Sequence, residues 1–321
     1  MDTRAIQVSR TGGPEVLEEV RREVPAPGPG EARVRHTAIG VNFIDTYHRS
    51  GVYPVPLPCV PGMEAAGVVE AVGEGVVHVA PGDRIVYFAP APGAYCEART
   101  LDARWLVRLP ESIPDDAAAA GWLKACTTEF LVERCAKVKP GDHVVVTAAA
   151  GGVGLLLCRW LAEVGATVIA VTSTEAKGAL ARAAGAHHCL GYGDLPAKVR
   201  ELTEGRGAQV VIDGVGKTTF EPALDSLARR GLLISFGNAS GKVGPVDFGI
   251  LAAKGSLFTT RPTLFDYYAS SEDFALGTAR VLAMWPKLSV TIGQRYRLAE
   301  AARCHADLEA RATTGSALLM P

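Results

Sequence analysis

A glycine-rich stretch near the middle of the chain has the spacing of a dinucleotide-binding turn. It reads Thr147-Ala148-Ala149-Ala150-Gly151-Gly152-Val153-Gly154 and lies between an apolar run and a helical pattern. Glycine at 151 would let backbone N–H groups approach a pyrophosphate, and glycine at 154 would let the helix pack closely against its strand. The positive end of that helix would favour the phosphate charge. The sequence therefore predicts a dinucleotide site, although Ala149 replaces the first glycine of the usual pattern.

The end of the second apolar run bears on which dinucleotide is bound. A carboxylate there would hold the ribose 2′-hydroxyl of NAD. Instead the run ends in Thr172-Ser173-Thr174, and Lys177 follows one turn later. Hydroxyls, helix-start amides and a cation suit a 2′-phosphate, so the sequence predicts NADPH. Two alternatives stay open: a reoriented Glu175 would be a ribose ligand for NAD, and Lys177 would otherwise be an ordinary solvated helix residue.

The elements that must position these residues recur at a regular interval. Short apolar runs begin near residues 144, 167, 188, 209, 232 and 256, at intervals of 21 to 24 residues. This is the period of a strand followed by a crossover helix, which parallel strands require. In the first helical stretch the apolar residues from Val153 to Val164 follow the helical period, and Gly165 stands at the expected C-cap. Six such units predict a doubly wound parallel sheet, an α/β Rossmann domain.

The first 120 or so residues have a different pattern, because prolines and glycines cluster there between short strand-like runs. We therefore expect a β-rich domain over residues 1–122 and the dinucleotide-binding domain over residues 123–260. Residues 261–321, where the rhythm stops, are expected to return to the first domain.

Composition excludes several classes of protein. The 321 residues carry 33 basic and 34 acidic side chains, so no charge excess favours nucleic acid or an anionic membrane as the main partner. The N-terminus lacks the layout of a signal peptide, and the longest uncharged run, Val144 to Cys158, is too short to span a bilayer. The seven cysteines include no C-x-x-C pair. We expect a soluble, cytoplasmic protein without a disulfide framework.

Motifs along the whole chain carry a resemblance to one family. They occur in family order at family spacing, and include GVNFIDTYHRSGVYP (40–54), PGMEAAGVVEAVG (61–73), AAAGGVG (148–154), SFGNASG (235–241) and RATTGSALLMP (311–321). In these segments the chain resembles the zeta-crystallin-like quinone oxidoreductases of the medium-chain dehydrogenase/reductase superfamily. The resemblance implies a GroES-like, β-rich catalytic domain interrupted by the Rossmann domain, and usually a homodimer.

Metal chemistry is not expected from the residues present. By resemblance, zinc members of the superfamily carry a Cys ligand in the region matching Gly40–Asp45 and a His in the region matching Gly62–Gly67. This chain has Asn42 and Met63 there, and no four-cysteine lobe. Without a Lewis acid, hydride from the nicotinamide C4 must reach an acceptor that is already electron-poor, such as a quinone or an α,β-unsaturated carbonyl. The resemblance therefore implies an NADPH-dependent, zinc-independent quinone reductase.

Site residues follow from the resemblance, position by position. Asn42 and Thr127 are expected at the nicotinamide end of the cofactor, and Tyr47 at the acceptor, where it either donates a hydrogen bond or only walls the pocket. Asp45 either orients neighbouring groups or shuttles protons. The remaining cofactor positions are Phe130, Gly151, Gly152, Val153, Gly154, Ser173, Thr174, Lys177, Tyr192, Phe236, Gly237, Asn238, Ala239, Ser240 and Arg311. For Arg311 a surface ion pair is the alternative.

Two departures from the family and several functions stay open. Gly214 stands where relatives often have serine, and Cys126 replaces an aliphatic residue, either as a small buried hydrophobe or as a reactive thiol.

The leading hypothesis of a quinone reductase has two alternatives, a 2-alkenal or enone reductase and a largely non-catalytic NADPH-binding protein. RNA binding is disfavoured, because no aromatic residues interleave with a basic stripe. A homodimer would cover the strand expected at Ser256–Thr260.

Overall fold

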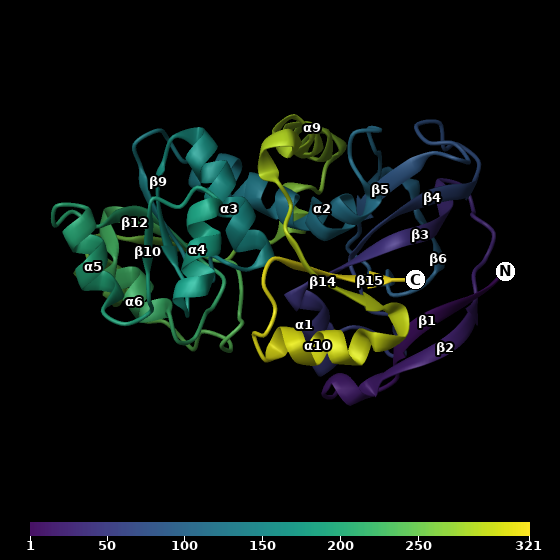
Figure 1. Cartoon of the computed structure of the whole chain (residues 1–321), viewed down its shortest axis with the longest axis horizontal. Coiled ribbons are helices and arrows are strands. Elements are labelled where there is room, and N and C mark those ends of the chain that lie inside the picture. Colours follow the sequence, from purple (N-terminus) through teal and green to yellow (C-terminus); the bar gives the residue numbers. More distant parts are fainter. The chain divides into compact units, whose positions relative to one another are not determined.

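The computed structural model describes residues 1–321, which divide into two compact units. One unit combines Met1–Leu123 with Val290–Pro321, and the other is Lys124–Ser289. The colours of Figure 1 show that the purple start and the yellow end of the chain belong to the same, β-rich unit. None of the helices has both the length and the apolar character that crossing a membrane requires.

The second domain boundary differs from our expectation. We predicted a return to the β-rich domain at residue 261, whereas residues up to Ser289 group with the dinucleotide unit. The reason is the helix α9 (Ser271–Leu288), which contacts α3 (Gly152–Val164) and is tied to it by an ion pair between Lys287 and Glu163. The rhythm stops after residue 260 because α9 leads to no further strand of that sheet. The first boundary lies within the helix α2 (Asp115–Glu129), one residue from the predicted position.

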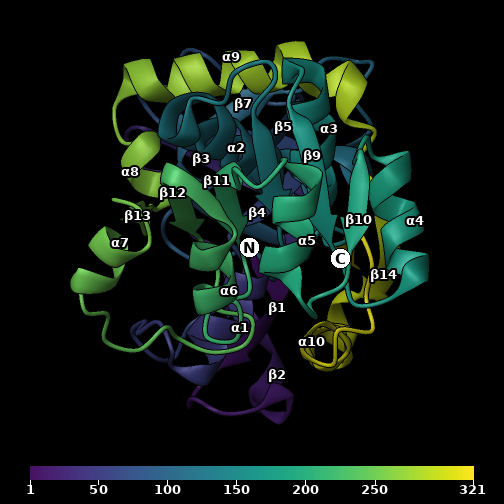
Figure 2. The same ribbon diagram turned by 90° about the vertical axis from the view of Figure 1, so that its left-hand side faces the viewer.

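The unit Lys124–Ser289 contains the predicted doubly wound sheet. Its six strands are all parallel and lie in the order β10-β9-β8-β11-β12-β13 (Figure 2). Their bounds are β8 (His143–Val146), β9 (Thr167–Val171), β10 (His188–Leu190), β11 (Ala208–Asp213), β12 (Leu227–Ser235) and β13 (Phe258–Thr260). The order reverses between β8 and β11, so the turns after these two strands diverge at the carboxyl edge, where such folds bind ligands.

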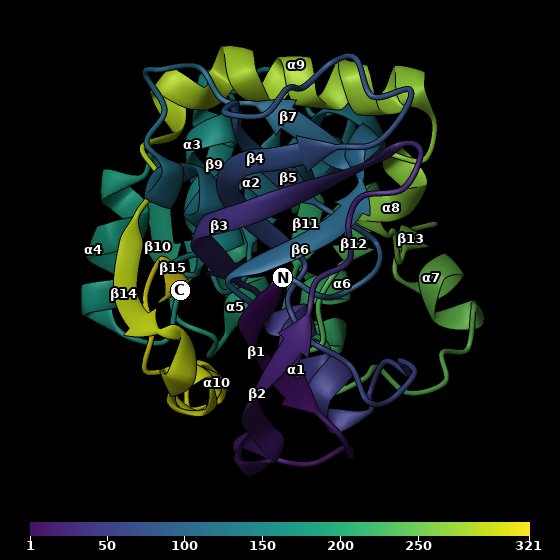
Figure 3. The ribbon, with the colours of Figure 1, turned by 90° about the vertical axis from the view of Figure 1, so that its right-hand side faces the viewer.

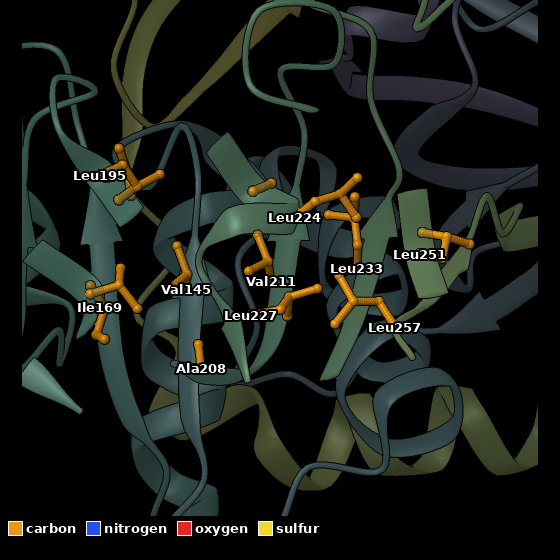
Figure 4. Close-up of a cluster of buried hydrophobic side chains, with 13 residues drawn as sticks. Val145, Ile169, Leu195, Ala208, Val211, Leu224, Leu227, Leu233, Leu251 and Leu257 are labelled. Atoms are coloured by element: carbon orange, nitrogen blue, oxygen red, sulfur yellow. The ribbon is translucent and has the colours of Figure 1, made fainter. Parts of the chain in front are cut away.

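Helices cover both faces of this sheet. On one face, apolar side chains of α5 (Leu195–Leu202), α6 (Phe220–Asp225) and α7 (Gly249–Ala253) pack on the strands. Figure 4 shows this core, in which Val145, Ile169, Val211 and Leu233 of four adjacent strands line one layer. On the other face, α3 buries Leu156, Trp160 and their neighbours and contacts α4 (Glu175–Ala183). As predicted, α3 ends at Gly165, whose backbone is left-handed.

Two further segments of this unit matter for the site. Helix α2 continues into a π-helical turn, Phe130–Ala136, a rare geometry that often accompanies functional sites. The segment that follows β13 forms the short helix α8 (Leu264–Tyr267) before α9 begins. Tyr267 of α8 stacks on Phe130, with ring centroids 4.6 Å apart.

The unit of Met1–Leu123 and Val290–Pro321 is rich in β-strands, as the sequence predicted. Its main sheet has the order β14-β15-β3-β4-β5-β7, with β6 also paired to β3 (Figure 3). The strands are β3 (Glu31–Val41), β4 (Glu64–Val72), β5 (Arg84–Phe88), β6 (Ala98–Asp102), β7 (Leu106–Arg108), β14 (Ile292–Arg297) and β15 (Ser316–Met320). A separate hairpin joins β1 (Asp2–Val8) and β2 (Leu17–Glu23), and two helices, α1 (Phe43–Ser50) and α10 (Ala301–Glu309), accompany the sheet. Because β15 pairs with β3, the last residues of the chain complete the sheet that the first hundred begin.

Candidate active site

The turn after β8 lies very close to the start of α3. Ala148 adopts a left-handed conformation, with φ of +48°, and its carbonyl accepts the N–H of Gly151 at 2.9 Å. A Cβ on Gly154 would lie 2.4 Å from that carbonyl oxygen, so the start of α3 can approach the turn only because residue 154 is glycine. A Cβ on Gly151 would meet the same oxygen at 3.3 Å, a tight contact. The first amides of α3, including those of Gly152 and Val153, have no acceptor within the helix by geometry.

A buried aspartate, whose function the sequence did not reveal, holds this turn in place. Asp213 at the end of β11 accepts hydrogen bonds from the hydroxyls of Thr147 at 2.6 Å and Thr219 at 2.8 Å. It also accepts the backbone N–H of Gly216 at 2.9 Å. Thr147 in turn accepts the N–H of Gly214 at 3.1 Å. One carboxylate therefore ties the turn after β8 to the turn after β11.

The loop after β12 packs directly on the turn after β11. A Cβ on Gly237 would lie 2.2 Å from the Gly214 carbonyl, and a Cβ on Gly214 would lie 2.9 Å from the Phe236 ring. Any side chain at position 214 would therefore collide with the Phe236 ring. This is a physical reason why the chain has glycine where relatives often have serine. Ser240 donates from its hydroxyl to the Val215 carbonyl at 2.9 Å and accepts the N–H of Thr218 at 3.0 Å. The predicted residues Phe236, Gly237, Asn238, Ala239 and Ser240 all lie in this loop.

The end of β9 presents the polar groups that the sequence indicated. Thr174 caps α4 and accepts the N–H of Lys177, and Ser173 and Thr174 are exposed. Glu175 forms an ion pair with Arg182 at 2.7 Å, two turns along the same helix. This pairing lowers the pKa of the Glu175 carboxyl, mainly through the hydrogen bond from Arg182. The carboxylate that would have favoured NAD is thus engaged along α4.

Tyr192, which follows β10, makes a contact that links two predicted segments. Its hydroxyl accepts the backbone N–H of Ala148 at 3.0 Å. Tyr192 therefore supports the left-handed turn after β8. It also lies near the end of β9, because β9 and β10 are paired.

The remaining predicted residues of this unit lie along α2 and the π-helical turn. Phe130 is buried against Tyr267, and Thr127 is 9% exposed. Cys126 is fully buried, which favours a small buried hydrophobe over a reactive thiol. Glu129, also fully buried, accepts hydrogen bonds from Tyr268 at 2.9 Å and Arg134 at 2.8 Å, and so anchors the segment after β13 to this helix.

In the β-rich unit, Asn42 is held at two points. Asn42 is the N-cap of α1, and its backbone N–H donates to Asp45 Oδ2 at 2.9 Å. Its side-chain Nδ2 donates to Glu64 Oε1 at 2.8 Å. Glu64 Oε2 accepts the backbone N–H of Leu123 at 2.7 Å. Glu64 is fully buried, and nothing in its local sequence marks it as a residue of the site.

Asp45 belongs to a buried chain of hydrogen bonds. The Tyr95 hydroxyl donates to Asp45 Oδ2 at 3.0 Å and lies 2.9 Å from His305 Nε2, while Arg49 Nη1 lies 3.2 Å from His305 Nδ1. Burial, with a smaller effect of the Arg49 charge, lowers the pKa of His305 to about 3. Burial likewise raises the pKa of the Tyr95 phenol well above its usual value. Asp45 thus orients the backbone of Asn42, the first of the two roles considered for it.

Tyr47 and Arg311 also belong to the β-rich unit. The half-buried Tyr47 packs in an aromatic group, with its ring 5.4 Å from Phe43 and 5.1 Å, edge to face, from Tyr53. Arg311 is exposed just after α10, with a left-handed backbone. Helix α1 therefore places two of the predicted residues, with Asn42 at its start and Tyr47 one turn later.

Comparison with known proteins decides the family. Residues 28–111 match the model of the alcohol dehydrogenase GroES-like domain, and residues 152–275 match that of the zinc-binding dehydrogenases. The chain is 46% identical to a quinone oxidoreductase of Pseudomonas aeruginosa over 99% of both chains, and 44% identical to quinone oxidoreductase 1 of Escherichia coli over the full length of both. The chain belongs to the quinone oxidoreductase family. It is therefore an oxidoreductase of the medium-chain dehydrogenase/reductase superfamily, as the motifs indicated.

Solved structures agree with this assignment. The quinone oxidoreductase of Escherichia coli, crystallised as a complex with NADPH, superposes with a TM-score of 0.97 at 42% identity and covers 99% of this chain. A second relative has another named activity. The 2-haloacrylate reductase of a Burkholderia species is 42% identical over 99% of this chain, and a solved 2-haloacrylate reductase superposes with a TM-score of 0.87.

The residues of this chain do not fit the zinc that the name of the zinc-binding dehydrogenase model implies. No group of three or more His, Cys, Asp or Glu side chains in the molecule is arranged to hold a metal ion. At the position expected for a cysteine ligand, Asn42 directs an N–H donor to Glu64, which is a hydrogen bond and not a ligand geometry. Met63, at the position expected for histidine, is buried.

Proposed function

We propose that the protein reduces quinones with NADPH and without a metal ion. The observation that carries the proposal is the full-length similarity to quinone oxidoreductases at 44–46% identity. Bound NADPH would supply hydride from C4 of the nicotinamide to an electron-poor carbonyl acceptor. The protein's own task is then to bind both molecules in contact and to stabilise the charge that develops on the acceptor oxygen.

The residues of the Lys124–Ser289 unit fit the cofactor. Gly151, Gly152, Val153 and Gly154 offer backbone amides and an uncrowded turn for the pyrophosphate. The loop from Phe236 to Ser240 and the helix residues Thr127 and Phe130 are proposed to contact the nicotinamide half. Arg311 of the β-rich unit is proposed as a further residue that contacts the cofactor.

Preference for NADPH rests on the end of β9. Ser173, Thr174 and Lys177 offer two hydroxyls and a cation for a 2′-phosphate, with Tyr192 on the neighbouring segment. Glu175, the carboxylate that follows Thr174, forms an ion pair with Arg182 along α4. The Escherichia coli relative crystallised with NADPH points the same way.

Asn42 and Tyr47 are proposed to act on the acceptor side. Each can donate a hydrogen bond, and such donors stabilise an oxyanion that forms as hydride arrives. The proton that completes reduction of the acceptor is proposed to come from solvent, because the buried chain from Asp45 runs through the Arg49 guanidinium, which does not release one.

A second candidate substrate class is favoured by the 2-haloacrylate reductase relative. An α,β-unsaturated carbonyl needs the same hydride geometry as a quinone. A panel of 1,4-benzoquinone, 2-alkenals and 2-haloacrylate separates the two substrate classes. Oxidation of NADPH, and separately of NADH, is followed at 340 nm on EDTA-treated protein. The proposal expects quinone-dependent oxidation that favours NADPH and survives EDTA. Faster turnover of every alkenal than of any quinone would contradict the quinone assignment, and cofactor binding without turnover would favour the non-catalytic alternative.

The protein is also proposed to act as a homodimer. Strand β13 pairs with β12 and forms one edge of the parallel sheet. Its Phe258 is 60% exposed, and an apolar edge strand without a cover promotes unwanted pairing. A second copy related by a two-fold axis would cover it.

A further inference from the structure

We propose that Glu64 is a positioning residue, which sets the orientation of the Asn42 side-chain amide for the reaction. This inference rests on the proposed function, in which Asn42 acts at the site. Glu64 itself is assigned no contact with acceptor or cofactor and acts only through Asn42.

The two oxygens of the Glu64 carboxylate accept hydrogen bonds from two different donors. Oε1 takes an N–H of Asn42 at 2.8 Å, and Oε2 takes the backbone N–H of Leu123 at 2.7 Å. A carboxylate offers acceptors at both oxygens, whereas an amide offers one acceptor and one donor group. Only a carboxylate side chain at this position satisfies two donors at once. The direction of the Asn42 amide is therefore set by the side chain at position 64.

Gly40 leaves space for the Glu64 side chain. Glu64 of β4 pairs with Gly40 of β3, two residues before Asn42. A Cβ on Gly40 would lie 2.4 Å from Glu64 Oε1 and 2.2 Å from the Ala119 carbonyl oxygen. The missing side chain of Gly40 lets the Glu64 side chain cross β3 and reach Asn42.

Both side chains of this pair are buried. Glu64 is 0% exposed and Asn42 is 7% exposed. Hydrogen bonds to a buried carboxylate are stronger than exposed ones, and the loss of a partner there is costly. The backbone N–H of Asn42 is held by Asp45, and its side-chain NH2 group is held by Glu64.

Replacement of Glu64 by glutamine should turn the Asn42 side-chain amide over, so that its oxygen and its NH2 group exchange places. The Leu123 N–H is part of the backbone and stays in place, so the single carboxamide oxygen of the new side chain would accept from it. The NH2 group of that carboxamide would then face Asn42, whose own amide must turn to accept with Oδ1. The side chains remain hydrogen-bonded, but the groups that Asn42 offers to the site are exchanged.

A double-mutant cycle tests the proposal. Enzyme saturated with NADPH is mixed with excess quinone, and the single-turnover loss of absorbance at 340 nm is recorded for wild type, Asn42→Ala, Glu64→Gln and the double variant. We expect Asn42→Ala to slow hydride transfer roughly 100-fold. Glu64→Gln should slow it at least about tenfold in the wild-type background and less than about twofold in the Asn42→Ala background.

Controls separate positioning from a general structural effect. Glu70→Gln makes the same exchange farther along β4, where the carboxylate pairs with Arg33 and Arg35 near the surface, and should leave the rate unchanged. Thermal unfolding and the NADPH dissociation constant are measured for each variant. If Glu64→Gln does not fold, Glu64→Asp is used in the same cycle, because it keeps the charge and withdraws the carboxylate from Asn42.

The outcomes distinguish the two proposals. Equal slowing by Glu64→Gln in both backgrounds, or no slowing in the wild-type background, overturns the positioning role while leaving the function of Asn42 intact. An unchanged rate for Asn42→Ala overturns the proposed role of Asn42 and the inference with it. A strong effect of Glu64→Gln that appears only with Asn42 present supports both.

Discussion

We propose that single side chains decide which dinucleotide the protein prefers. Ser173, Thr174 and Lys177 follow the end of β9, where a carboxylate would select NAD. The nearest carboxylate, Glu175, is paired with Arg182. We therefore propose that the selectivity depends on the polar residues at one strand end and on one ion pair along α4.

Replacement of Lys177 by alanine should weaken NADPH binding by about 10- to 100-fold, because a charged hydrogen bond to the phosphate contributes roughly 1.5–3 kcal/mol. Binding of NADH, which has no 2′-phosphate, should change little. Fluorescence titration with both cofactors measures the two dissociation constants. Lys198→Ala, an exposed lysine of α5, is the matched control. An equal loss of affinity for both cofactors would show that Lys177 supports the fold rather than the phosphate.

Tyr47→Phe tests the hydrogen bond proposed for the acceptor oxygen. We expect kcat/KM for quinone to fall about tenfold, equivalent to roughly 1.4 kcal/mol of transition-state stabilisation, with the NADPH dissociation constant unchanged. The comparison variant is Tyr296→Phe, which removes a hydroxyl that bonds to Asp307 in the same unit. Full activity of Tyr47→Phe would leave Tyr47 as a wall of the pocket, packed between Phe43 and Tyr53.

Among the elements, the junction of β8 and α3 is the most constrained. The helix begins so close to the turn that residue 154 has no space for a Cβ, and the turn itself is held by Asp213 and by the Tyr192 hydroxyl. Such rigidity is useful where backbone amides must face a phosphate, since little order has to be gained on binding.

Gly154→Ala should therefore displace the start of α3. We expect a loss of about 1–3 kcal/mol in the free energy of unfolding, typical of overpacking, together with weaker NADPH binding. Urea unfolding and cofactor titration measure the two effects. Gly244→Ala introduces the same methyl group where no atom lies within 4 Å, and both quantities should stay at their wild-type values. Wild-type behaviour of Gly154→Ala would argue against the tight junction.

The stability of the whole molecule should depend on pH through two buried histidines. Burial lowers the pKa of His36 from 6.5 to about 4 and that of His305 to about 3. The unfolded chain therefore binds more protons than the folded protein below about pH 6.5, so stability is complete above that pH and declines as the pH falls toward 4. At pH 5 each histidine should lower the free energy of unfolding by about 2 kcal/mol.

Urea unfolding between pH 5 and 8 measures this slope. His305→Gln should be less stable overall, because it disturbs the bonds to Tyr95 and Arg49, but its stability should fall less steeply with acid. His78→Gln, at an exposed position, should keep the wild-type slope. A slope unaltered by His305→Gln would contradict the low pKa of His305.

Assembly is the other property of the whole molecule that can be tested. Phe258→Glu places a charge on the exposed edge strand β13 and should shift the proposed homodimer toward monomer in sedimentation velocity at micromolar concentration. Val77→Glu alters a residue of the β-rich unit that is 93% exposed and should leave the mass unchanged. Wild-type protein that sediments as a monomer would end the dimer proposal.

Much of the fold and part of the site were predictable from sequence. The period of the βα units, the helix that ends at Gly165 and the turn from Thr147 to Gly154 appear as predicted, because strand–helix alternation and glycine spacing are local properties of the chain. The end of the dinucleotide unit was predicted at residue 260 and lies at Ser289, because α9 packs on α3 without the strand that would have marked it.

The sequence by itself determined the family, the cofactor turn and the polar end of β9. The tertiary structure alone decided which groups support them. Three hydrogen-bonded pairs join residues that are distant in sequence. Asn42 and Glu64 are 22 residues apart, Thr147 and Asp213 are 66 apart, and Tyr95 and His305 are 210 apart. The physical reason is that a buried polar group must find a hydrogen-bond partner wherever the fold brings one near. Sequence periodicity shows which face of an element is buried, but it does not show which distant side chain will be there.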